Sequence, residues 1–315
     1  MTKKTLLLII IISLLLPFCE NNLSAAEPKD TSGNNSQNSS IDRNNQMMLA
    51  FVQRMKSGNV TEARKIAKEM TAFANKYTDT ADVEYKNFYS NMEKELYLLK
   101  NKNSKKKVVW VDDPIADGYY FLAVIDFQAK HYKEAKENIQ KCIFWNPVRA
   151  PYYCERGFIF LNSGVESDYI SAQVAYEQAL EYADNEEDFA SALRGVGFAF
   201  ASRNMFEESV AAMVLSKEFE PNNTDAEEHI LRMKNFIPSF DFSMDSKKAR
   251  KILKDNKIQT TYSPEHVKVL IKLASELKMP EEKEKALIFL TRAQMLEPVN
   301  VEVINKLKEI QKKIE

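Results

Sequence analysis

The segment Tyr119-Tyr120-Phe121-Leu122-Ala123 opens an internal repeat that fills residues 116–221. In this copy a ring follows at Tyr132, Ala135 comes three residues later, and Pro147 comes twelve residues after Ala135. Another copy has the same spacing in Leu193-Arg194-Gly195-Val196-Gly197, Phe206, Ser209 and Pro221. A recurring unit of this kind predicts a chain built from consecutive pairs of helices.

The spacing resembles the tetratricopeptide repeat, a unit of about 34 residues that folds as two antiparallel helices. The resemblance implies an all-α fold in which antiparallel helix pairs form a right-handed superhelical solenoid. It predicts three units with a capping helix over residues 116–236, and one unit with a capping helix over residues 263–315. Small residues stand at the predicted helix crossings, where a larger side chain would push the backbones apart: Ala123, Gly157, Gly197 and Ala274.

The segments around these units fit the repeat less well. Residues 46–107 are interpreted as a degenerate N-terminal helical unit, with a third helix from about Ala81 to Leu99. The apolar run Val108–Val111 is either an edge strand or, as we favour, an extended lead-in to the first clear unit.

The second irregular part covers residues 237–262, which are interpreted as a linker. It contains a short basic helix, expected over Asp245–Asp255. Ser263-Pro264-Glu265 then has the residues of a helix start, with Ser at the N-cap and Pro at the first helical position.

The N-terminus has the pattern of an export signal. Lys3 and Lys4 precede Leu6–Phe18, an uncharged run shorter than the roughly 20 residues of a membrane-spanning helix. Residues 1–26 are therefore interpreted as a signal peptide of a bacterial protein, which predicts a location in the periplasm or the cell envelope.

Two ways of processing this signal compete. Small residues before the bond favour cleavage after Ala26. The alternative is lipidation at Cys19, although Phe18 replaces the small residue that normally precedes such a cysteine. The polar residues 27–45 bury too little apolar surface to fold, so they are expected to form a disordered linker, or a membrane tether if the cysteine is lipidated.

The family resemblance also implies a binding face. Its members usually bind peptides or protein surfaces in a concave groove lined by the first helix of each unit. Carried onto this sequence, the groove positions are Tyr120, Val124, Phe127, Cys154, Phe158, Leu161, Arg194, Phe198 and Ala201. For any one of these residues the competing interpretation is burial under a neighbouring helix.

Two charged residues replace apolar ones on adjacent first helices. Asp126 stands where the family usually has a large aromatic residue, and Arg156 stands where it usually has Leu. Because an unpaired buried charge is costly, the two residues either form a pair or lie at the edge of the array.

Other chemistry has little support in the sequence. The net charge of −1 gives no general attraction to nucleic acid, and the basic run Lys100–Lys107 is interpreted as a solvated linker. The three histidines lie far from any metal-ligand spacing, so no metal or cofactor is expected. Cys142 and Cys154 either form a disulfide or, as we favour, remain thiols that face different ways.

The expected function is that of a non-catalytic scaffold that holds a partner protein or peptide of the cell envelope. One alternative is an envelope enzyme subunit with catalytic residues in segments 78–115 or 237–262. The other is a module that binds a small molecule or glycan on Trp110 or Trp145, although packing is the expected role of Trp145. No catalytic residue is nominated.

Overall fold

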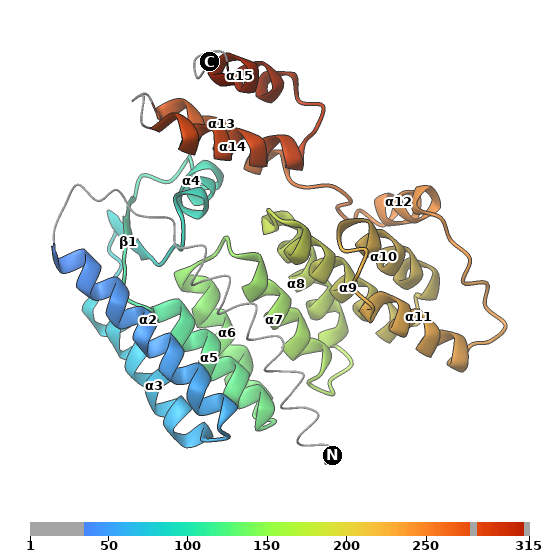
Figure 1. Ribbon diagram of the computed structural model, residues 1–315. Coiled ribbons are helices and arrows are strands. Elements are labelled where there is room, and N and C mark those ends of the chain that lie inside the picture. Colours follow the sequence, from blue (N-terminus) through green and yellow to red (C-terminus); the bar gives the residue numbers. More distant parts are fainter. Residues whose placement is uncertain (1–34, 278–281, 312–315) are drawn as a thin grey trace. The chain divides into compact units, whose positions relative to one another are not determined.

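The computed structural model describes residues 35–277 and 282–311 (Figure 1). These residues contain fourteen α-helices, one short 3-10 helix and two β-strands. The chain divides into two compact units between Pro147 and Val148. Within each unit, helices that follow one another in the sequence pack as consecutive pairs.

Four helices of the first unit pack in sequence: α2 (Asn35–Lys56), α3 (Val60–Ala72), α5 (Ile115–Gln128) and α6 (Tyr132–Trp145). The turn between α2 and α3 uses Gly58, whose positive φ of 75° favours a residue without a side chain. Asn59 then caps α3, because its side chain accepts a hydrogen bond from the backbone N–H of Glu62. The 3-10 helix η1 (Phe73–Lys76) follows α3 directly.

The core of the first unit joins α2 and α3 to α5. Phe51 of α2 stacks on Phe121 of α5, with ring centroids 3.8 Å apart, and both side chains are buried. Gly118 of α5 lies so close to α3 that an added Cβ would be 2.8 Å from Cβ of Met70 and 2.9 Å from the backbone N of Thr71. Helix α3 therefore makes more of the contact with α5 than α2 does.

A small β-α-β segment lies between η1 and α5 in the sequence. Strands β1 (Val83–Lys86) and β2 (Lys107–Trp110) pair in parallel, and α4 (Asn91–Lys100) connects them. The register joins Val83 to Lys107 and Lys86 to Trp110. Parallel strands need a crossover of this kind, because the chain must return to the same end of the sheet.

This segment corrects three expectations. The fold is mostly α rather than all-α, and the helix expected from Ala81 to Leu99 begins only at Asn91. Ser90 fixes that start, since its side chain accepts a hydrogen bond from the backbone N–H of Glu93. The apolar run that ends at Val111 lies largely within β2, so the edge-strand interpretation is correct and the extended lead-in is wrong.

The second unit contains the remaining described helices: α7 (Ala150–Leu161), α8 (Asp168–Tyr182), α9 (Glu186–Ser202), α10 (Phe206–Phe219), α11 (Asp225–Phe236), α12 (Ser246–Asp255), α13 (Pro264–Glu276), α14 (Lys283–Leu296) and α15 (Val301–Gln311). Helices α7 to α10 pack in sequence, and α7 also contacts α9. Helices α11 and α12 both contact α10. Helix α14 packs on α13, and α15 packs on α14.

Glycines lie at close helix contacts in this unit. A Cβ on Gly157 would lie 2.7 Å from the ring of Tyr176, and a Cβ on Gly197 would lie 2.7 Å from Cε of Met213. The sequence prediction of small residues at these two crossings is confirmed. Gly195 is a third such position, since its Cβ would lie 2.1 Å from Cδ1 of Tyr176. The ring of Tyr176 thus packs against two helices, α7 and α9.

Several other element boundaries agree with the sequence, but the start of α2 does not. The basic helix is present as α12, capped by the Asp245 side chain, and Ser263 caps α13 as expected. However, α2 includes residues 35–45, which were expected to be a disordered linker. Within this part of α2, Arg43 and Asn44 bind the chain around Asp113.

The predicted signal peptide and Cys19 lie outside the described residues, as do residues 27–34 of the expected linker. Among the helices that the structure describes, none has both the length and the hydropathy needed to cross a bilayer.

Candidate functional site

The predicted groove residues of the first unit are largely part of its core. Tyr120 and Val124 of α5 are only 5% and 3% exposed. Phe127, near the end of α5, is half-buried, and its ring lies edge-on to that of Tyr132, with centroids 5.8 Å apart. In this unit the competing interpretation, burial under neighbouring helices, therefore holds for Tyr120 and Val124.

On α9 of the second unit, the predicted groove residues contact the chain that follows α10. Arg194 is 8% exposed, and its Nη1 lies 2.6 Å from Oε2 of Glu220. Phe198 lies edge-on to His229 of α11, with ring centroids 4.6 Å apart. Ala201 is half-buried. Helix α11 and the turn before it thus occupy part of the face that the sequence assigned to a partner.

On α7 the predicted groove residues keep an open side. Cys154, Phe158 and Leu161 recur at the spacing of one helix face, and each is half-buried. On the opposite side of the same helix, Tyr152 and Ile159 are 0% exposed. An apolar row of partial exposure therefore runs along α7, and we call Cys154, Phe158 and Leu161 the α7 row.

A carboxyl group with a shifted pKa lies near the start of this row. Burial, together with the charge of Asp184, raises the pKa of Asp188 to about 6, although Asn185 donates a hydrogen bond of 2.8 Å to the carboxylate. Burial, and next the negative charge of Asp188, raise the pKa of Cys154 well above its usual range. The thiol of Cys154 is therefore protonated at neutral pH and behaves as a small apolar group.

The charge of Asp126 is compensated inside the first unit. Asp126 is 3% exposed, and its Oδ1 lies 2.6 Å from Nη2 of Arg64 on α3. Asn138 Nδ2 donates to the other carboxylate oxygen at 2.8 Å. The guanidinium of Arg156 instead lies over the ring of Phe160, 5.5 Å from its centroid. Asp126 therefore has its cation in Arg64, a partner that the sequence analysis did not identify.

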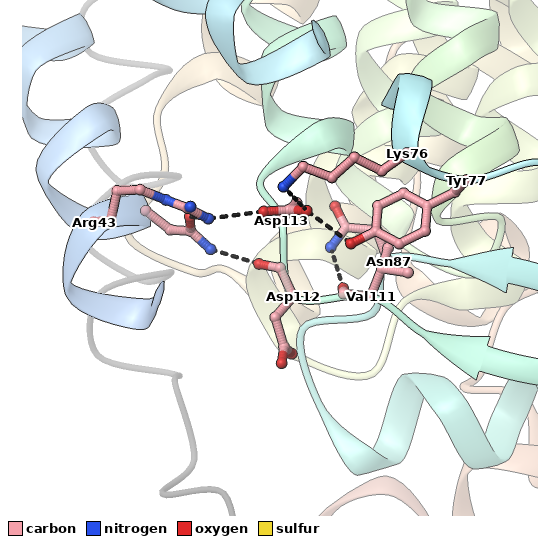
Figure 2. Close-up of polar contacts among 8 residues, drawn as sticks. Arg43, Lys76, Tyr77, Asn87, Val111, Asp112 and Asp113 are labelled. Atoms are coloured by element: carbon pink, nitrogen blue, oxygen red, sulfur yellow. Dashed lines mark hydrogen bonds and ion pairs between the residues drawn. The ribbon is translucent and has the colours of Figure 1, made fainter. Parts of the chain in front are cut away.

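Figure 2 shows a second buried carboxylate, Asp113, on which side chains from α2 and from the end of η1 converge. Arg43 Nη2 lies 2.7 Å from Oδ1 of Asp113, and Lys76 Nζ lies 3.2 Å from Oδ2. The hydroxyl of Tyr77 donates to the same Oδ2 at 2.7 Å. Burial and this hydrogen bond raise the pKa of Tyr77 to about 12. Three donors thus occupy a carboxylate that is 7% exposed, which makes it a structural group.

Asn87, also drawn in Figure 2, ties the β-α-β segment to the helices. Its Nδ2 donates to the carbonyl of Val111 at 2.9 Å, and its Oδ1 accepts from the backbone N–H of Ala116 at 3.0 Å. Its own backbone N–H donates to the carbonyl of Trp145 at 2.8 Å. Asn87 therefore connects the end of β1 with the start of α5 and the end of α6. Nothing in the local sequence around Asn87 indicates this role.

One lysine of the segment is buried. Lys86, at the end of β1, is 4% exposed, and its Nζ lies 4.4 Å from the centroid of the Phe144 ring. Burial lowers the pKa of Lys86, while Asp79 and Glu84, each 3.9 Å away, act in the opposite direction. The ammonium group is enclosed by these side chains, so it is poorly placed to meet a substrate.

The two tryptophans also pack against neighbours. Trp145 is 6% exposed and lies edge-on to Tyr77, with centroids 6.3 Å apart, which confirms the packing role expected from the sequence. Trp110 is half-buried and lies edge-on to Phe88, with centroids 6.2 Å apart.

Other reactive side chains are equally enclosed. Ser209 Oγ lies 3.2 Å from Nε2 of His229, but Ser209 is 0% exposed. Burial lowers the pKa of His229 to about 4. Cys142 and Cys154 do not form a disulfide with each other. Within residues 35–277 and 282–311, no three His, Cys, Asp or Glu side chains are grouped to hold a metal ion.

The sequence matches no protein-family model, and no curated protein is significantly similar to it. The likeness to tetratricopeptide proteins therefore rests on the spacing in this sequence and on its consecutive helix pairs.

Proposed function

We propose that the chain is a non-catalytic scaffold of the tetratricopeptide type that holds a partner protein or peptide in the bacterial cell envelope. The packing of successive helix pairs supports this proposal, and so do the glycines at the helix crossings. In the proposed fold, the pairs within each unit follow the right-handed superhelical course of that family.

The observation that carries the proposal is the α7 row. Cys154, Phe158 and Leu161 are half-buried, although a helix in a closed core would bury such residues fully. Apolar residues at this helical spacing can contact successive apolar side chains of a segment bound along the helix.

The nearby charge suggests the chemistry of the bound segment. Asp188 accepts a proton more readily than an ordinary carboxyl group, because its ionised form is poorly solvated. A cation placed against Asp188 would restore the favourable electrostatics of the ionised form. The preferred partner segment therefore has apolar side chains for the α7 row and one Lys or Arg for Asp188.

The proposed location follows from the N-terminus. The run Leu6–Phe18 directs export, and the chain is then either released after Ala26 or held at the membrane through Cys19. Both routes place the helical units outside the cytoplasm.

The experiment that tests the scaffold is a crosslinked pull-down of the full-length protein from its own envelope fraction, read by mass spectrometry. The double variant Phe158→Ser/Leu161→Ser removes the open apolar row. The matched control is Ile170→Ser/Val174→Ser on α8, where the two side chains are 59% and 46% exposed.

We expect a stoichiometric partner that the α7 variant loses and the α8 control retains, with both variants folded by circular dichroism. The proposal is wrong if the α7 variant keeps the partner, or if the wild-type protein captures none.

A further inference from the structure

Helix α12 carries an unusual concentration of positive charge. Its sequence, Ser246–Asp255, contains five cations and one carboxylate, in a chain whose net charge is −1. Ala249 and Leu253 are 0% exposed, and the helix packs on α10 (Figure 1). Lys247, Lys251 and Lys254 lie on the other side, because they recur at i, i+4 and i+7 and are exposed. We call these three residues the α12 lysine row.

The cations beside this row have structural partners. Lys248 Nζ lies 3.0 Å from Oε1 of Glu207, and Arg250 pairs with Glu218, both on α10. Arg250 also donates to the carbonyl of Thr260 at 2.8 Å. These contacts fix the rotation of α12 about its own axis. No carboxylate of the described chain pairs with the lysine row, so its charge is directed to solvent.

We propose that the α12 lysine row binds the surface of an anionic bilayer. An isolated ammonium group is a point charge, without the planar fork with which Arg selects one carboxylate or phosphate. Several such charges on one helix face suit a diffuse negative surface, where the attraction of each lysine adds to that of the others.

An exposed aromatic residue favours lipid over nucleic acid or an acidic protein. Helix α11 ends at Phe236, whose side chain is 87% exposed, and the segment after it leads to α12. Peripheral membrane proteins combine basic residues with exposed rings, because the ring enters the boundary of the acyl chains while the charges stay in water. The proposal assigns that apolar contact to Phe236, and salt would not screen it.

The test measures how the full-length protein partitions onto two kinds of vesicle. One kind is phosphatidylcholine alone, and the other contains about 30% phosphatidylglycerol, in about 0.1 M salt. The variant Lys247→Gln/Lys251→Gln/Lys254→Gln removes the row. The matched control is Lys102→Gln/Lys105→Gln/Lys106→Gln, which removes the same charge from an exposed loop before β2.

We expect the wild-type protein to prefer the anionic vesicles. The loss of the row should lower that preference at least tenfold, since each lysine near such a surface contributes roughly fivefold. The loop control should stay within about twofold of wild type. Phe236→Ser should instead lower the binding that remains at about 0.5 M salt.

Three results would overturn the proposal. One is a wild-type protein without preference for anionic vesicles. Another is an equal loss in the loop control, which would show a net-charge effect alone. The third is lysine-dependent binding to heparin or DNA without any vesicle preference, which would assign the row to an anionic polymer. If the triple variant does not fold, Lys251→Gln alone replaces it, and this variant should lower the preference for anionic vesicles about fivefold.

Discussion

Arg64 Nη2 on α3 lies 2.6 Å from Asp126 Oδ1 on α5. The carboxylate is buried, whereas the Arg64 side chain is 32% exposed, so the cation reaches inward from the surface to neutralise a charge in the core. This pair joins α3 to α5.

The first prediction concerns this pair. Arg64→Ala leaves a buried carboxylate without its cation and should lower the free energy of unfolding by about 2 kcal/mol. Asp126→Ala should cost a similar amount, because it removes the acceptor for Asn138 as well. In urea unfolding the double variant should lose clearly less than the sum of the two single losses. Strict additivity would show that the pair contributes no coupling.

The second prediction concerns Gly195. Gly195→Ala places a methyl group where the ring of Tyr176 lies, so it should lower the free energy of unfolding by about 1–2 kcal/mol. In the background Tyr176→Leu that ring is absent. There Gly195→Ala should stabilise the protein by about 0.5–1 kcal/mol, since Ala is the better helix former. Unchanged destabilisation in the second background would contradict the steric explanation.

The third prediction is a loss of stability in weak acid that depends on His229. The folded-state pKa of His229 is lowered to about 4 by burial and by Arg232, below the value of about 6.5 in an unfolded chain. Between these values the unfolded chain binds more protons, so stability falls as the pH falls from about 6.5 to 4. At pH 5 the loss should be on the order of 1 kcal/mol, after allowance for partial exposure.

The control is His229→Gln, which removes the titrating ring. Relative to wild type, this variant should gain stability as the pH falls from 7 to 4, in urea unfolding at several pH values. A constant difference over that range would assign the acid sensitivity to other groups.

The fourth prediction has the opposite sign and involves Asp188. Its pKa is raised by burial to about 6, so between about pH 4 and 6 the folded protein binds more protons than the unfolded chain. The buried charge of Asp188 therefore lowers the free energy of unfolding fully above pH 6, and this loss of stability disappears as the pH falls toward 4. Asp188→Asn removes this penalty and should be more stable relative to wild type at pH 7 than at pH 4.

Asp188→Asn also provides a check on the proposed partner. If the bound segment places a cation against Asp188, the variant should bind that partner about tenfold more weakly while its own stability rises. Equal affinity for the partner would remove Asp188 from the binding face.

Short-range signals explain what the sequence predicts well. Asp245 and Ser263 precede helices that they cap, and a cap depends only on the next three residues. The glycines at 157 and 197 follow from the repeat spacing, because each unit needs a small residue where its own two helices meet. The consecutive helix pairs follow from the same spacing.

Long-range contacts explain what the sequence did not predict. Each strand has only four residues, and β1 gains its stability from β2, which comes later in the chain after a helix. The apolar residues of β1 and α4 together have a spacing that also fits one long helix, which is why a single helix was predicted there. Burial of Tyr120 and the contact of Phe198 with α11 depend on tertiary packing, which the residue spacing within one helix does not encode.

The hydrogen bond between Tyr77 and Asp113 joins the two ends of the β-α-β segment. The chain therefore leaves the helical stack and re-enters it at neighbouring points, and a short turn can span the gap at little entropic cost. The segment is thus an insertion between α3 and α5, two helices that also contact each other directly. The same geometry makes it a natural place for grafting, since a foreign domain whose own termini are adjacent would replace it without displacing α3 from α5.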